Sequence, residues 1–107
     1  MSKASKHDAE QVFAALGDRT RLILVSKLGN GDALSATALA HGADVTRQAI
    51  VKHLQLLDDV GLVRRHKEGR EVLYTLETRR VNEARAFLDA ISARWDRAIE
   101  RLRKHVE

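Results

Sequence analysis

Two short helical patterns, joined by a four-residue connection and followed by an alternating segment, constrain the fold of this chain more than any other feature. The first pattern begins after Ser35, which is a good N-cap residue. The second begins after Thr46, another N-cap candidate, and is closed by Gly61. Residues 42–45 lie between the two patterns and match the connection length of a helix-turn-helix unit. The sequence therefore predicts such a unit, with its second helix over residues 46–60.

After the second helical pattern the apolar period changes from that of a helix to that of a strand. Val72, Tyr74 and Leu76 alternate with a period of two. Gly69 supplies the tolerance of positive φ that a short hairpin loop requires. We therefore predict a two-stranded hairpin, here called the wing, over residues 62–76.

Two helical patterns precede the helix-turn-helix. The first runs from Asp8 to Gly17, and Asp18 is placed to cap the second. In the second helix the expected buried stripe consists of Leu22, Ile23, Val25 and Leu28. Residues 1–7 are polar, and we expect them to form a flexible arm.

A long amphipathic helix over residues 78–107 completes the chain. Its apolar side chains recur every three or four positions and include Ala84, Phe87, Leu88, Ile91, Trp95, Ala98, Ile99, Leu102 and Val106. A domain with so small a core has more apolar area on this helix than one copy can cover, so we expect self-association. The alternative is that Trp95 packs onto its own domain. The predicted dimer interface joins the first and last helices and consists of Val12, Phe13, Leu16, Phe87, Ile91, Trp95, Ile99 and Leu102.

The composition agrees with one mainly helical domain. The chain has 107 residues, contains no proline, and has only 4% aromatic residues, whereas sandwiches and barrels are enriched in aromatic and β-branched residues. It also lacks cysteine, which excludes disulfides, thiolate metal sites and a cysteine nucleophile. We predict a mainly α fold with a small β-hairpin wing, forming a single winged helix-turn-helix domain over residues 1–107.

Membrane insertion and enzymatic catalysis find no support in the sequence. No apolar stretch approaches the roughly 18 residues that span a bilayer. The first eight residues lack the apolar core of a secretory signal, so we expect a cytoplasmic protein. No nucleophile elbow, phosphate loop, zinc-protease or dinucleotide-binding pattern occurs. We therefore expect no enzymatic activity and no cofactor.

The outer face of the helix over 46–60 carries side chains suited to reading bases in the major groove. Its expected core face consists of Ala49, Ile50, Leu54, Leu57 and Val60. The remaining positions, together with the N-cap, form the predicted DNA-contacting set on this helix: Thr46, Arg47, Gln48, Val51, Lys52 and Gln55. Arginine can fork onto guanine, glutamine can bridge adenine, and valine can contact the thymine methyl group.

The wing carries the cations Arg64, Arg65, Lys67 and Arg70, which favour contact with phosphates or the minor groove. Of these, Arg65, Lys67 and Arg70 belong to the predicted DNA-contacting set. A formal net charge of +4 also favours a polyanionic partner, here double-stranded DNA. Glu68 and Glu71 interrupt the basic residues, so a solvated hairpin is the alternative for the wing. For the whole chain, the competing hypothesis is a protein-interaction adaptor that does not bind specific DNA sequences.

Three segments together resemble one known family. They are residues 13–24 (FAALGDRTRLIL), residues 46–54 (TRQAIVKHL) and residues 56–76, from the helix end through the wing. In this order they resemble the arsenical-repressor (ArsR/SmtB) family of bacterial winged-helix regulators. The resemblance implies a homodimer, an inverted-repeat operator and repression by blocking a promoter. Because the family often has serine where this chain has Val51, the base preference at that position does not carry over.

The family's metal site on the last helix does not carry over either. That site uses an Asp-x-His pair completed by a later His-x-x-Glu. Here Asp89 is followed two positions later by Ile91, and His105 has no partner at the required spacing. Asp96 and Glu100 lie at helical spacing among arginines and are better explained as solvated charges. We therefore expect a member of the family without a metal site, and its effector is left open.

Overall fold

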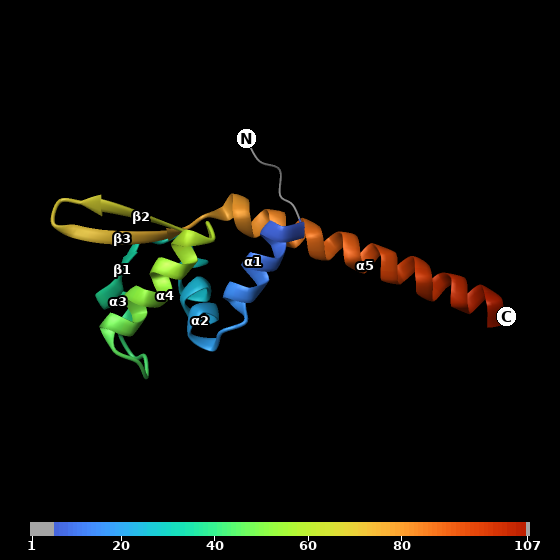
Figure 1. Cartoon of the computed structure of the whole chain (residues 1–107), viewed down its shortest axis with the longest axis horizontal. Coiled ribbons are helices and arrows are strands. Elements are labelled where there is room, and N and C mark those ends of the chain that lie inside the picture. The colour runs from blue at the N-terminus through green and yellow to red at the C-terminus, as the bar shows by residue number, and fades with distance from the viewer. Residues whose placement is uncertain (1–5, 107) are drawn as a thin grey trace.

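The computed structural model describes residues 6–106 of the chain and the side chains from Ala9 onward. Its elements, in chain order, are α1 (Lys6–Leu16), α2 (Arg19–Leu28), β1 (Leu34–Ser35), α3 (Ala36–Ala40), α4 (Arg47–Asp59), β2 (Val63–Glu68), β3 (Glu71–Leu76) and α5 (Thr78–Val106) (Figure 1). This arrangement confirms the predicted mainly α, winged helix-turn-helix fold class. The predicted arm over 1–7 lies outside the described residues as far as residue 5, and is wrong for residues 6 and 7, which begin α1.

The three predicted helix caps are confirmed. The side-chain oxygens of Asp18, Ser35 and Thr46 each accept a hydrogen bond from the backbone N–H three residues later, at 3.0, 3.1 and 3.1 Å. Each bond satisfies a donor that a helix start would otherwise leave unpaired. Gly42, with φ of 76°, supplies the left-handed backbone between α3 and α4. Local hydrogen bonds and one glycine thus set the bounds of the helix-turn-helix.

The sheet has three strands, whereas the sequence predicts two. The strand order is β1-β3-β2 and both pairings are antiparallel. In the added strand, Leu34 pairs with Tyr74 and Ser35 with Leu73. Two residues are too few to show an alternating pattern, and Ser35 also caps α3, so the sequence signal there is that of a helix start. The pairing attaches the wing directly to the first helix of the helix-turn-helix.

The hydrophobic core lies where α1, α2, α3, α4 and the sheet meet. Its fully buried side chains include Val12, Leu24, Leu28, Leu39, Ile50, Leu54, Leu57, Leu62 and Val63. The predicted core face of α4 is confirmed by Ile50, Leu54 and Leu57. The predicted stripe of α2 is wrong at Leu22 and Ile23, which are 50% and 44% exposed. Consecutive apolar residues cover most sides of this short helix, so its periodicity does not identify the side that faces the core.

Helix α5 leaves the body of the molecule as a rod of about 43 Å (Figure 1). Near its start Ala84 is buried, and the rings of Phe13 and Phe87 lie 5.9 Å apart. Further along, Trp95 and Leu102 are each 65% exposed. The radius of gyration is 17.6 Å, against roughly 13 Å for a compact chain of this length. Much of the apolar side of α5 is therefore uncovered within one copy.

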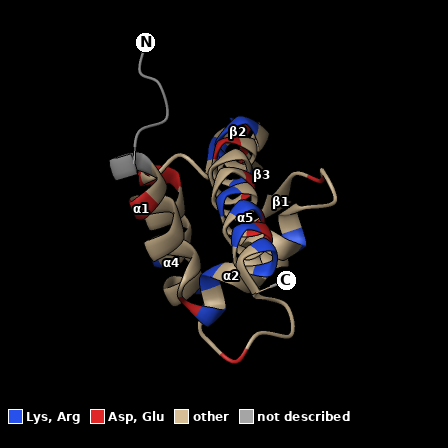
Figure 2. Ribbon diagram, turned by 90° about the vertical axis from the view of Figure 1, so that its right-hand side faces the viewer, with Lys and Arg blue, Asp and Glu red and all other residues tan. Residues whose placement is uncertain are grey.

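None of the described helices combines the length and the apolar character needed to cross a membrane. Although α5 is long enough, charged residues recur along it up to its last turn (Figure 2). Its amphipathic pattern, with one apolar side and one charged side, is that of a helix whose charged side is exposed to water.

Candidate nucleic-acid interface

Helix α4 presents three differently used sides. One side is apolar and faces the core. Arg47, Val51 and Gln55 follow one another at intervals of one turn and line a groove beside the sheet. Gln48 and Lys52 occupy the adjacent side and are exposed. The helix therefore presents two adjacent rows of side chains on its outer surface, one with an apolar residue between an arginine and a glutamine and the other with a glutamine and a lysine.

The groove, with a volume of ≈ 710 Å³, runs between α3 and α4 on one side and the sheet on the other. It is formed by residues far apart in the sequence. Five of the nine predicted DNA-contacting residues line it: Arg47, Val51, Gln55, Arg65 and Arg70. The other four lie outside the groove and are exposed: Thr46, Gln48, Lys52 and Lys67. The fold thus brings the outer side of α4 and the cations of the wing together around one concave surface.

The wing turns its cations toward this groove through its strand pairing. Arg65 pairs with Tyr74 and Lys67 with Val72. Directly paired residues lie on the same face of a sheet. Both cations therefore lie on the same face as Tyr74 and Val72, which line the groove. Arg64 lies on the opposite face, where its Nε is 2.6 Å from a carboxylate oxygen of Glu77. The carboxylate of Glu77 therefore neutralises the charge of Arg64.

Arg65, Lys67 and Arg70 form no ion pair with any residue in the part of the chain that the structure describes. Arg70 lies in the two-residue turn that follows Glu68, after Gly69, whose φ is 61°. Positive φ at the first turn position only is the arrangement of a type II′ hairpin turn. The wing therefore holds three cations that form no ion pair among the described residues, and the carboxylate residue Glu71 lines the groove beside Arg70.

Two of the α4 side chains that line the groove are already held by hydrogen bonds. Arg47 donates from Nε to Thr37 Oγ1 at 3.0 Å. Gln55 donates from Nε2 to Asp59 Oδ1 at 2.9 Å. Thr37 belongs to α3 and is not among the residues that the sequence predicts to contact DNA. The sequence identifies Thr37 only as a polar residue on a short helix, because its hydrogen-bond partner Arg47 is ten residues away.

Behind α4, His53 joins the helix to the junction of α1 and α2. Its side chain is 24% exposed. Its Nδ1 lies 3.3 Å from Arg21 Nη1 and 3.8 Å from Asp18 Oδ2. Arg21 also donates from Nε to the backbone oxygen of Ala15 at 2.7 Å.

The same cluster changes the acidity of Asp18. The backbone N–H of Arg21, which donates to the Asp18 carboxylate, is the largest cause of a lowered pKa, and the charges of Arg21 and His53 act in the same direction. The ionised carboxylate is thus favoured by the folded structure.

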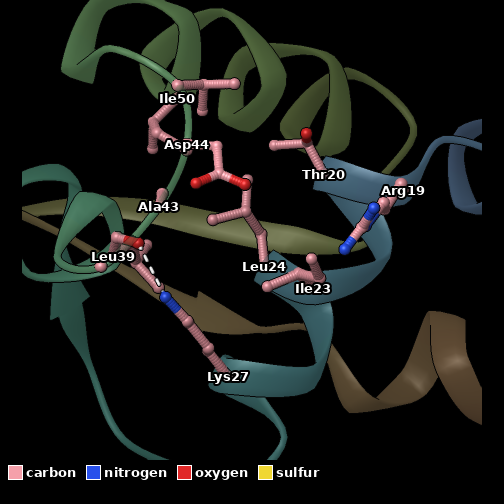
Figure 3. A pocket seen from close by; sticks show the side chains of 11 residues that line it. Arg19, Thr20, Ile23, Leu24, Lys27, Leu39, Ala43, Asp44 and Ile50 are labelled. Carbon is pink, nitrogen blue, oxygen red and sulfur yellow. Dashed lines mark hydrogen bonds between the residues drawn. The ribbon is translucent and has the colours of Figure 1, made fainter.

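A second cavity, of ≈ 410 Å³, lies between α2 and the turn that joins α3 to α4. Leu24, Leu39 and Ile50 contribute apolar walls (Figure 3). Lys27 reaches across and donates to the backbone oxygens of Leu39 and His41, at 3.1 and 3.4 Å. These are carbonyls at the end of α3, which a short helix cannot satisfy internally. The cavity therefore contains a link that holds α3 against α2.

The residues expected at a dimer interface fall into three groups. Phe13, Leu16, Phe87 and Ile91 are half-buried, and Trp95, Ile99 and Leu102 are exposed. Val12 is only 1% exposed because it is part of the chain's own core, so its inclusion in the interface is corrected.

Within the described residues, no group of three or more His, Cys, Asp or Glu side chains is arranged to hold a metal ion.

Comparison with solved structures identifies a similar chain over nearly the whole length. A solved ArsR-like transcriptional regulator from Rhodococcus sp. RHA1 is 39% identical, with a TM-score of 0.81 and coverage of 94% of both chains. No protein-family model matches the sequence.

Two curated proteins of Bacillus subtilis (strain 168) are also similar. One is an uncharacterised HTH-type transcriptional regulator, YuzN, with 36% identity over 67 residues, covering 57% of this chain and 73% of YuzN. The other is the transcriptional repressor SdpR, with 30% identity over 67 residues, covering 63% of this chain and 73% of SdpR. These relatives are named as transcriptional regulators, and none is named as an enzyme.

Proposed function

Because the chain belongs to the ArsR family of winged helix-turn-helix transcriptional regulators, we propose that it is a homodimeric repressor that binds an inverted-repeat operator and blocks a promoter. Membership of this family identifies the chain as a DNA-binding regulator. The dimer, the operator and the repression are the parts that we propose.

The groove between α4 and the wing is the observation that carries the proposal. It joins Arg47, Val51 and Gln55 on one side to Arg65 and Arg70 on the other. Bases in the major groove are read by arginine, glutamine and apolar side chains, whereas phosphates are held by cations at the flanks. In the proposed complex α4 enters the major groove and the wing lies along the adjacent backbone. Gln48, Lys52 and Lys67 extend these contacts from outside the groove, with Thr46 at the start of the helix.

The uncovered side of α5 supports the proposed dimer. Trp95, Ile99 and Leu102 expose 65%, 48% and 65% of their surface. A second copy that packs on this stripe, with Phe13 and Leu16 of α1 at its edge, would remove it from water. A twofold dimer that reads an inverted repeat places its two α4 helices about 34–36 Å apart, in successive major grooves. Repression is proposed because SdpR, one of the relatives, is named a transcriptional repressor.

Selection of bound sequences from a random duplex library tests the proposal. The wild-type protein is expected to enrich an inverted repeat with half-sites about 10 base pairs apart. Arg47→Ala and Gln48→Ala should each relax one position of the half-site, at a cost of roughly 1–3 kcal/mol for the contacted base pair. The matched control is Arg97→Ala, which removes an exposed arginine of α5 outside the groove.

Equal enrichment of all sequences by the wild-type protein would contradict sequence-specific regulation. Binding of a protein partner, with DNA binding absent, would instead indicate the adaptor function. A relaxed half-site in the Arg97→Ala control would show that removal of a charge alone, and not removal of a base contact, changes the profile.

A further inference from the structure

We propose that Thr37 is a positioning residue for DNA recognition: it determines which edge of Arg47 reads the base and connects that base contact to a neighbouring phosphate. The inference rests on the proposed function and adds a specificity-determining residue on α3, outside the α4 helix and the wing.

The hydrogen bond between the two side chains restricts the Arg47 guanidinium. Arg47 donates from Nε to Thr37 Oγ1 at 3.0 Å, and both residues line the groove. A guanidinium has five N–H donors in one plane. With the Nε donor engaged, the edge that remains free is the end formed by Nη1 and Nη2. This end matches the paired acceptors O6 and N7 of guanine. Thr37 thus selects an end-on contact with guanine.

Thr37 is itself held in a fixed position. It lies two residues after Ser35, which pairs with Leu73 of β3 and caps α3. The far end of α3 is fixed by the hydrogen bonds from Lys27. A short helix secured at both ends provides a rigid support for an arginine that would otherwise sample many rotamers, and preorganisation of this kind lowers the entropic cost of binding.

The hydroxyl of Thr37 has a second use. A threonine hydroxyl accepts hydrogen bonds and donates one. In this case it accepts from Arg47, and its O–H donates to no acceptor among the described residues. Thr37 is exposed, and it belongs to the first helix of the helix-turn-helix, which crosses the DNA backbone in this class of complex. A phosphate oxygen is therefore the acceptor that we assign to it. The phosphate contact would hold the Thr37 hydroxyl in place as the acceptor for Arg47 Nε, so it fixes the position of the guanidinium that contacts the base.

Competition between duplexes that differ at one base pair tests the role of Thr37. Thr37→Val keeps the shape of the side chain and removes the hydroxyl. We expect it to lower the preference for guanine at the Arg47 position by roughly three- to tenfold, the effect of removing one hydrogen bond. The salt dependence should stay unchanged, because it reflects the number of cationic groups bound to phosphates. Thr37→Ser should retain the preference. The control Thr78→Val alters an exposed threonine at the start of α5 and should also retain it.

A second measurement addresses the phosphate. Replacing single phosphates near the contacted guanine by neutral methylphosphonates should identify one that weakens wild-type binding but has little further effect on Thr37→Val. Circular dichroism of each variant checks folding, and Thr37→Ala replaces Thr37→Val if the latter does not fold.

The outcomes separate this inference from the proposed function. Equal binding of all duplexes by the wild-type protein overturns both. A wild-type preference that Thr37→Val leaves unchanged overturns the role of Thr37 alone. A weakening that is equal for all sequences overturns the orienting role of Thr37 on Arg47, because loss of the phosphate contact or of local structure alone would produce that result.

Discussion

At the scale of single residues, Asp18 connects the start of α2 to α4. Its carboxylate accepts the capping hydrogen bond of α2 and lies 3.8 Å from His53. The bond from the Arg21 backbone lowers the pKa of Asp18 below its ordinary value of 3.8. A lowered folded-state pKa means that ionised Asp18 stabilises the fold fully above the ordinary value, and that this stabilisation disappears as the pH falls through the lower, folded-state value.

Asp18→Asn tests this dependence, because asparagine still caps the helix but cannot ionise. We expect the variant to be less stable than the wild-type protein near neutral pH, by an amount that shrinks as the pH falls below about 4. Urea denaturation over a series of pH values measures the difference in the free energy of unfolding. A difference that stays constant into the acid range would show that the charge of Asp18 has no part in stability. Asp18→Ala, which also removes the cap, should be the less stable of the two variants.

At the scale of elements, the wing holds the cationic side chains of Arg65 and Arg70 beside the groove. Its central strand β3 pairs with β2 on one side and with β1 on the other, so the hairpin is tied to α3. We expect Arg65→Ala and Arg70→Ala to weaken binding to all sequences alike, because each removes a cation that binds a phosphate. The log–log salt slope should become shallower by about 0.9 for each phosphate that is no longer neutralised. Titrations at several salt concentrations measure this slope.

Arg64→Ala is the matched comparison within the same strand. Arg64 lies on the other face of the sheet and is paired with Glu77. Its removal should leave the salt slope close to the wild-type value. If Arg64→Ala reduced the slope as much as Arg65→Ala, the face of the wing that meets DNA would be assigned incorrectly.

At the scale of the whole molecule, α5 carries the surplus charge. Eight Lys or Arg and four Asp or Glu residues lie within Thr78–Val106, so this helix accounts for the formal net charge of +4. Two copies that pair through α5 therefore bring like charge together, and salt screens their repulsion. We expect added salt to tighten the dimer while it weakens DNA binding.

Sedimentation at two salt concentrations measures the dimer directly. Trp95 provides a second signal because it is the only tryptophan of the chain. Its 65% exposure in one copy should decrease on pairing, which would protect its fluorescence from acrylamide. Leu102→Glu should give a monomer with exposed Trp95. A dimer that dissociates as salt is added would contradict the assignment of α5 as its interface.

The features that could be predicted from the sequence depend on nearby residues. Ser35 and Thr46 cap helices that follow at once, and Gly69 occupies a turn whose backbone favours glycine. The core side of α4 follows from its 3.6-residue period, as does the opposite side on which the DNA-contacting residues were proposed. Such signals are readable because each involves only one helix or one turn of the chain.

Which of these elements meet was set by packing in three dimensions. In the folded chain Leu24 is buried and Leu22 is exposed, and Val12 belongs to the chain's own core. Strand β1 also pairs with the wing. Packing also placed Thr37 within hydrogen-bonding distance of Arg47. None of these outcomes has a local signal, because burial and pairing depend on the surface that each element finds opposite it. The order of residues along the chain was enough to define the elements and their polar and apolar sides, whereas the contacts between elements required the folded arrangement.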